Sequence, residues 1–178
     1  MKKGTRVTQV GNLRHKKQST APAAARQHSP RATCATCADE AEAIFRQTFN
    51  CCQAVIAAYA EQHGLDRDTA LKLATGFGGG VSHMGKMCGA VTGAVMVLGL
   101  RHGRCRVEDV AAKQKTMDMV RQFARRFRQR HGALDCRQLL GCDLNKPEEF
   151  EWAKKQGLFA TRCPKLVRDA VAILEELH

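Results

Sequence analysis

The chain has 178 residues, of which 44% are hydrophobic and 5% aromatic, and it carries a formal net charge of +12. A chain of this length suits one domain with a full hydrophobic core. Val and Ile are scattered, and no segment alternates apolar with polar residues over the length of a strand, which argues against a β-sheet protein. Instead, apolar residues recur at helical spacing in segments that Gly and Pro separate. The sequence therefore predicts an all-α fold.

Residues 1–38 carry most of the positive charge. They contain eight of the 29 Lys and Arg residues and no Asp or Glu, which leaves 21 basic and 17 acidic residues in the rest of the chain. Because this segment has few large apolar side chains, it cannot bury enough surface to fold alone, and we predict a disordered basic arm. It lacks the apolar segment of a secretory signal. We expect a solvated tail, with a weak polyanion contact as the alternative.

Apolar residues at spacings of three and four predict a single-domain bundle of about five to seven helices over residues 39–178. Asp66 and Asp135 are expected N-caps, and Pro147 and Pro164 are expected at first helical positions. The predicted helices cover about residues 39–63, 67–75, 87–102, 107–130, 135–140, 147–156 and 164 onward.

The helix predicted over residues 107–130 has an apolar face and a basic face. Its predicted apolar stripe consists of Met117, Val120, Ala124 and Phe127. Arg121, Arg125 and Arg128 share another face, which a nucleic-acid module would interleave with exposed aromatic residues. Phe123 lies off the predicted stripe without such alternation, so the basic face is expected to be simply solvated.

A glycine-rich stretch, GFGGGVSHMGKMCGAVTGAVMVLGL, occupies residues 76–100. It follows no predicted strand and lacks the GK[ST] ending of a phosphate loop. Its apolar run over residues 87–100 is too short for the ~20 residues that cross a bilayer, so a buried core helix is expected. Gly89 and Gly93 predict close approach of a neighbouring helix, which would bring Cys51 toward Cys88. His83 is a weak candidate for a base or ligand.

Nine cysteines are present without an export signal, so we expect a cytoplasmic protein whose thiols stay reduced unless they have a function. Cys88, Cys136 and Cys163 fall at predicted helix N-termini, where the helix dipole lowers the pKa of a thiol. Cys51 lies in the middle of the first predicted helix, and we expect its side chain to face the core and join these three cysteines. Other cysteines show no decisive pattern: Cys34 and Cys37 form a CxxC that is expected to be accessory, and Cys52, Cys105 and Cys142 are interpreted as small core residues.

Four spaced motifs resemble the C_GCAxxG_C_C family of redox-active proteins: FNCCQAV (49–55), GFGGG…CGAVTGAVMVLGL (76–100), DCRQLLG (135–141) and CPKLV (163–167). The resemblance covers the chain from about Ala41 onward. It implies that the family's four cysteines correspond to Cys51, Cys88, Cys136 and Cys163, with the alignment through QAV favouring Cys51 over Cys52. The central motif reads Cys-Gly-Ala-x-x-Gly, a different letter order from the family label. The family implies a helical prokaryotic protein with redox activity, and it names no substrate.

The favoured function is thiol-based redox chemistry or redox sensing, with an unknown partner protein and no membrane. In this hypothesis a thiolate, expected to be Cys88, attacks a disulfide or accepts oxidation, and a second cysteine of the cluster resolves the product. The alternative is electron transfer, with the same four cysteines as ligands of zinc or an iron–sulfur cluster. Their spacing matches no short ferredoxin or zinc-finger pattern. A third hypothesis, polyanion binding, rests on the arm and the basic face alone.

Overall fold

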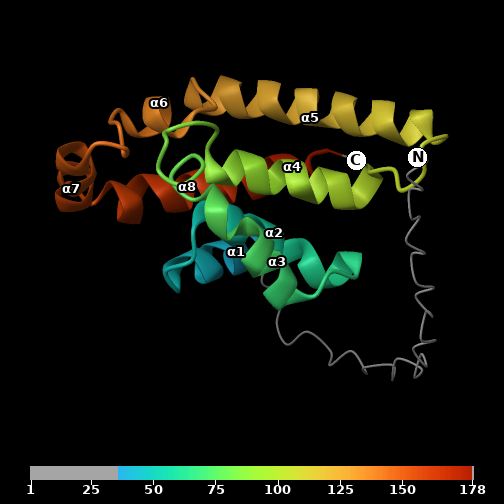
Figure 1. Cartoon of the computed structure of the whole chain (residues 1–178), viewed down its shortest axis with the longest axis horizontal. Coiled ribbons are helices and arrows are strands. Elements are labelled where there is room, and N and C mark those ends of the chain that lie inside the picture. The colour runs from blue at the N-terminus through green and yellow to red at the C-terminus, as the bar shows by residue number, and fades with distance from the viewer. Residues whose placement is uncertain (1–35, 178) are drawn as a thin grey trace, which may run out of the picture. The chain divides into compact units, whose positions relative to one another are not determined.

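The computed structural model describes residues 36–177, and this part of the chain contains helices and turns, with one isolated β-bridge between Met87 and Asp135. The all-α prediction is therefore confirmed (Figure 1). Most of the predicted arm, including Cys34, lies outside the described residues. The α-helices are α1 (Cys37–Arg46), α2 (Cys51–Ala60), α3 (Arg67–Ala74), α4 (Gly89–His102), α5 (Val110–His131), α6 (Cys136–Leu140), α7 (Pro147–Lys155) and α8 (Leu158–Glu175). Short 3-10 turns, η1 (Glu61–His63) and η2 (Thr75–Phe77), extend α2 and α3.

The number of helices in the described residues, eight, exceeds the expected five to seven because the first predicted helix is two helices. The chain leaves α1 at Gln47 and passes through Thr48, whose φ of 71° lies in the left-handed region. The Asn50 side chain then accepts the N–H groups of Cys52 and Gln53, and the Gln53 side chain accepts the Asn50 N–H, which forms a capping box. Cys51 is therefore the first residue of α2 and not, as expected, in mid-helix.

The last helix also begins earlier than expected. Gly157, with a φ of 66°, precedes α8, and Pro164 lies inside the helix instead of opening it. Cys163 is consequently an interior helical residue, so the prediction that it occupies a helix N-terminus is wrong. A proline inside a helix removes one hydrogen bond and usually destabilises it. Burial of the following apolar residues offsets that cost here, because Val167 and Ala170 are fully buried in the main core.

Helix α4 lies at the centre of the fold and packs against α2, α5 and α8 (Figure 1). Its glycines allow the close contact with α2 that their spacing predicts. A Cβ atom added at Gly93 would lie 2.9 Å from both the Cys52 carbonyl oxygen and the Val55 Cβ. One added at Gly89 would lie 3.1 Å from the Cys51 Cβ. The backbone of α2 thus rests directly on α4, which brings the first turns of both helices together.

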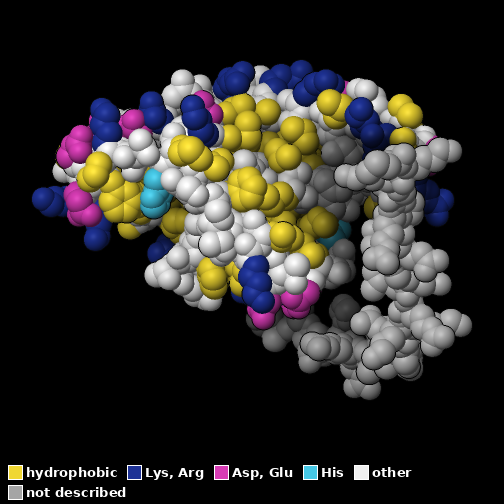
Figure 2. Space-filling model, in the orientation of Figure 1, with side chains coloured by type: hydrophobic (Ala, Val, Ile, Leu, Met, Phe, Trp, Pro, Cys, Tyr) yellow, Lys and Arg dark blue, Asp and Glu magenta, His cyan; other side chains and the backbone are white. Residues whose placement is uncertain are grey.

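Helix α5 bears out only part of the expected stripe, since Phe127 is fully buried and Val120 packs against the core, but Met117 does not. Its buried residues are Met119, Phe123 and Phe127, spaced four apart, whereas Met117 is 43% exposed. The expected stripe followed the helical period but left out Met119 and Phe123, and only the contact with α4 and α8 decides the register. Figure 2 shows Lys and Arg side chains along the edge of the molecule where Figure 1 places α5. No helix in the described part of the chain is long and apolar enough to cross a membrane.

Candidate functional site

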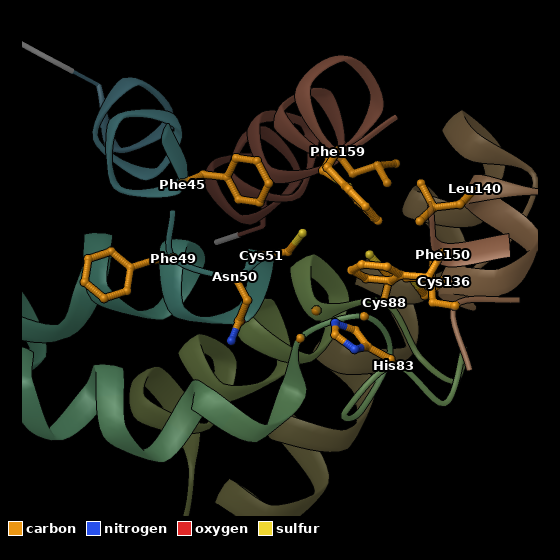
Figure 3. Close-up of a pocket in the computed structure, with 16 residues that line it drawn as sticks. Phe45, Phe49, Asn50, Cys51, His83, Cys88, Cys136, Leu140, Phe150 and Phe159 are labelled. Carbon is orange, nitrogen blue, oxygen red and sulfur yellow. The ribbon is translucent and has the colours of Figure 1, made fainter. Parts of the chain in front are cut away.

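A cavity of about 210 Å³ lies where the glycine loop, residues 78–88, meets the ends of several helices (Figure 3). The structure brings all four cysteines singled out from the sequence, Cys51, Cys88, Cys136 and Cys163, to its wall. They come from α2, the start of α4, α6 and α8. The other residues that line the cavity are Phe45, Phe49, Asn50, Gly78, Gly79, His83, Gly89, Leu140, Leu144, Phe150, Phe159 and Leu166.

Cys88 is the N-cap residue of α4 and is 2% exposed. Its pKa is lowered, first because the Cys51 thiol donates a hydrogen bond to its sulfur. The backbone N–H groups of Ala90 and Val91, in the first turn of α4, add to this effect. These donors outweigh burial, which acts in the opposite direction. Cys88 is thus the cavity thiol whose surroundings favour the thiolate.

Cys51 contacts two other cavity cysteines. Its pKa is raised well above the ordinary thiol value, first by the hydrogen bond with Cys163, then by the one with Cys88, and then by burial of its sulfur. The helix start gives Cys51 little compensation, because the Asn50 side chain already accepts the N–H groups of Cys52 and Gln53. Cys51 therefore remains a protonated thiol, whose single S–H group can donate to Cys88.

Cys136 is the first residue of α6 and is 6% exposed. Burial is the main cause of its raised pKa, and the charges of Cys88 and Cys163 add to it. Two backbone hydrogen bonds hold this segment beside the start of α4. The Cys136 N–H donates to the Lys86 carbonyl at 2.7 Å, and the Cys88 N–H donates to the Leu134 carbonyl at 2.9 Å. The positions of Cys88 and Cys136 are therefore coupled through the backbone.

The glycine loop follows a left-handed path beside these two cysteines. Gly79, Gly80, Val81, Ser82 and His83 all have positive φ angles, and this conformation is costly for a β-branched residue such as Val81. A Cβ atom added at Gly80 would lie 2.7 Å from the Cys136 Cβ, so only glycine fits there. The His83 ring, in the middle of this loop, lies against Phe150 at the cavity wall, with ring centroids 5.1 Å apart.

A fifth thiol, which sequence reasoning assigned to the general core, lies in the same apolar cluster as Cys136 and Cys163. This thiol is Cys142, which is 5% exposed and does not line the cavity. Its pKa is raised, mainly by burial. The only signal in the sequence is its position just after Gly141, the C-cap residue of α6, and no motif marks it.

The remaining described cysteines lie away from the cavity. Cys52 is fully buried, as expected of a core residue, and burial raises its pKa to about 11. Cys105 is exposed, so the expectation that it belongs to the core is wrong. Cys37 is half-buried at the start of α1. All eight cysteines in the described residues are free thiols.

The alternative role of the four cavity cysteines as metal ligands stays a prediction. Within residues 36–177, no group of three or more His, Cys, Asp or Glu side chains is arranged to hold a metal ion. On the basic face of α5, Arg121 is ion-paired with Asp118, and the neighbouring Arg126 and Arg130 are ion-paired with Glu176.

A family model described as "Putative redox-active protein (C_GCAxxG_C_C)" matches residues 49–177. The match includes all four cavity cysteines and both segments that form the cysteine-bearing ends of α2 and α4. No curated protein and no solved structure matches the chain.

Proposed function

The chain belongs to the C_GCAxxG_C_C family of redox-active proteins, and on that premise we propose that it carries out dithiol–disulfide exchange at the four-cysteine cavity. Cys88 is the attacking thiolate and Cys51 the resolving thiol. One observation carries this proposal: the sulfur whose surroundings lower its pKa accepts a hydrogen bond from a thiol whose pKa is raised. An attacking and a resolving group are thus in contact before any substrate arrives.

The exchange proceeds in two steps. The Cys88 thiolate attacks a disulfide R–S–S–R, which forms Cys88–S–S–R and releases R–S⁻. Cys51 then transfers its proton to the released R–S⁻, and its thiolate attacks the Cys88 sulfur, which forms the Cys51–Cys88 disulfide and releases the second R–S⁻. Two protein sulfurs lose two electrons in total, and the disulfide bond of R–S–S–R gains them.

The hydrogen bond between the two cysteines explains why the second step follows the first. While Cys88 is an anion, it holds the Cys51 proton and contributes to the high pKa of Cys51. Once Cys88 is part of a mixed disulfide, this contribution disappears, so Cys51 releases its proton more readily. Cys163, which also contacts Cys51, supplies a second thiol for further exchange.

The test uses the reduced full-length protein, purified without oxygen and treated with bis(2-hydroxyethyl) disulfide. We expect the loss of two free thiols and, by peptide mapping, a link between Cys51 and Cys88. Cys51→Ala should accumulate the mixed disulfide on Cys88, whereas Cys88→Ala should form neither product. Cys105→Ala, at an exposed site outside the cavity, is the matched control and should behave as the parent protein.

Two results would overturn the proposal. The first is a Cys88→Ala variant that still forms the cavity disulfide at the parent rate. The second is stoichiometric zinc or iron, found by elemental analysis of the same sample, whose removal is needed before the four cysteines react. That result would favour the ligand role of Cys51, Cys88, Cys136 and Cys163.

A further inference from the structure

We propose that the disulfide substrate of this cavity is a small, uncharged, apolar molecule, and that glutathione-type and protein disulfides are excluded. This inference rests on the proposed function and names the substrate class of the same site. Four properties of the cavity wall support it: burial of the sulfurs, volume, absence of charge and aromatic composition.

The attacking sulfur, that of Cys88, is too deeply buried for a protein disulfide, whereas the resolving Cys51 is half-buried. Cys88 is 2% exposed, and Cys136 and Cys163 are each 6% exposed. An attacking sulfur must approach the disulfide along the S–S axis. A disulfide on the surface of a second folded protein cannot reach into the cavity unless the protein that contains the cavity opens. Access is therefore limited to molecules that fit inside.

The volume sets the size of such a molecule. At about 210 Å³, the cavity has room beside Cys88 for one aromatic half of a small disulfide, such as a benzene ring with its sulfur. A tripeptide disulfide would have to leave most of its polar atoms outside this space.

Within residues 36–177, the wall offers no ion-pair partner for a charged group. The lining residues of this part of the chain include no Lys, Arg, Asp or Glu, and His83 is their one titratable side chain apart from the cysteines. The polar atoms of Asn50 are already used, because its oxygen accepts from Cys52 and Gln53 and its nitrogen donates to the carbonyl of Thr75 at 3.0 Å. A carboxylate that entered would lose its water and meet no Lys or Arg counter-charge on these residues, with the His83 ring and the thiols as the side-chain donors that remain.

Aromatic side chains provide most of the remaining wall. Four of the seven phenylalanines in the chain line the cavity: Phe45, Phe49, Phe150 and Phe159. Each is only partly buried, so these rings face accessible space instead of the packed core. The rings of Phe150 and Phe159 lie 5.5 Å apart at a tilted angle, a spacing suited to contact with another ring. Figure 3 shows Phe45, Phe150 and Phe159 near the labelled cysteines, with Phe49 farther away on the side of Asn50. The wall therefore selects an apolar ligand.

The test compares two aromatic disulfides that differ in charge. Di(2-pyridyl) disulfide is uncharged at neutral pH, whereas 5,5′-dithiobis(2-nitrobenzoate) carries two negative charges. The rate of modification of Cys88 in the reduced full-length protein is measured with each reagent by rapid quenching and peptide mapping. The same Cys88 in the urea-unfolded chain corrects for the intrinsic reactivity of the reagents. We expect the ratio of neutral to anionic rates to be at least tenfold higher in the folded protein.

A matched pair of variants tests whether the cavity wall causes this preference. Phe159→Lys places a cation on the wall and should raise the rate with the anionic reagent about tenfold. Ala160→Lys adds the same charge one residue away, at an exposed position that does not line the cavity, and should change that rate by less than about threefold. Circular dichroism checks that both variants are folded.

The outcomes separate this inference from the proposed function. Equal ratios in the folded and unfolded protein, with the Cys51–Cys88 disulfide still formed, would overturn the substrate class alone. Efficient oxidation of Cys88 by glutathione disulfide would do the same. If neither aromatic disulfide yields the Cys51–Cys88 link, the proposed function itself fails.

Discussion

Helices α4 and α6 each start at a buried cysteine that lines the same cavity, yet the pKa values of these two thiols are shifted in opposite directions. The pKa of Cys88 is lowered, whereas that of Cys136 is raised. Cys88 is the N-cap residue, so its side chain faces the free N–H groups of Ala90 and Val91. Cys136 is one residue further into its helix, and Asp135 occupies the cap position.

The cap position contributes to this difference, but the hydrogen bond from Cys51 is the first cause of the lowered pKa of Cys88, and burial is the main cause of the raised pKa of Cys136. Only the N-cap side chain can turn back to accept the N–H groups of the second and third helical residues. Cys51 supports the same conclusion, because it too is a first helical residue and Asn50 accepts the N–H groups of its helix. Without those donors, burial keeps Cys136 protonated, and the hydrogen bonds with Cys163 and Cys88, followed by burial, keep Cys51 protonated.

Removal of Cys88 is expected to have the largest effect on this contrast. At pH 7 the parent protein should show a fast phase of alkylation by iodoacetamide, and Cys88→Ala should slow the fastest cavity thiol by ~100-fold, since only thiolates react. Cys136→Ala should leave the fast phase within about threefold. A fast phase that survives in Cys88→Ala, or disappears in Cys136→Ala, would break the contrast.

Separation of α2 from α4 should have the next largest effect, on stability. Gly93→Ala forces the two backbones apart and should lower the free energy of unfolding by ~2 kcal/mol, measured by urea denaturation. Gly99→Ala is the control in the same helix, because a Cβ there meets nothing within 4 Å. It should raise stability by ~0.5–1 kcal/mol. Equal effects of both changes would mean that the close contact is unimportant.

The pH dependence of reactivity should separate Cys88 from Cys136. Below the lowered pKa of Cys88, its alkylation rate should fall about tenfold per pH unit as the thiolate is protonated, while Cys136 should react only at strongly alkaline pH. Mass spectrometry of the two peptides gives both profiles. Coincident profiles would contradict the assignment of the two sites.

The same pKa shifts affect stability with opposite signs. The contribution of Cys88 is present above the ordinary thiol pKa of ~8.5 and is lost as the pH falls through its lowered value. Those of Cys51 and Cys136 are present below ~8.5 and are lost as the pH rises toward their raised values, because the unfolded thiols ionise first. Urea denaturation between pH 6 and 10 measures the sum.

Removal of the charge next to Cys136 should have the smallest effect. Asp135 contributes to the raised pKa of Cys136, but burial is the main cause. Asp135→Asn keeps a capping residue and should change the alkylation rate of Cys136 by less than about twofold at pH 9. A large acceleration would mean that charge, and not burial, keeps this thiol protonated.

Part of this architecture could be predicted from the sequence. The all-α fold and the helix starts near Cys88 and Cys136 follow from local patterns, as does the contact of α4 with the segment that carries Cys51. Local signals also misled: Pro164 is typical of a helix start, but α8 continues through it because its apolar residues are buried in the core. The capping box from Asn50 to Gln53 was present in the sequence, but an uninterrupted apolar period concealed it.

The cavity wall could not be predicted in this way. Its four phenylalanines come from α1, the turn before α2, α7 and α8, and they share no spacing that would indicate a common site. The left-handed path of the glycine loop continues through Val81, Ser82 and His83, which do not favour it on their own. Backbone hydrogen bonds within residues 76–86 and the close packing of Gly80 beside Cys136 together hold the loop in this form.

Pro164 has one further consequence for the cavity. Because proline has no N–H group, the carbonyl of Ala160 lacks its partner within α8, and the helix is weakest between its first turns and the remainder. Phe159 belongs to those first turns, while the residues after Pro164 are anchored in the core. The interrupted hydrogen-bond ladder thus falls between the aromatic part of the cavity wall and the part of α8 that anchors it to the core.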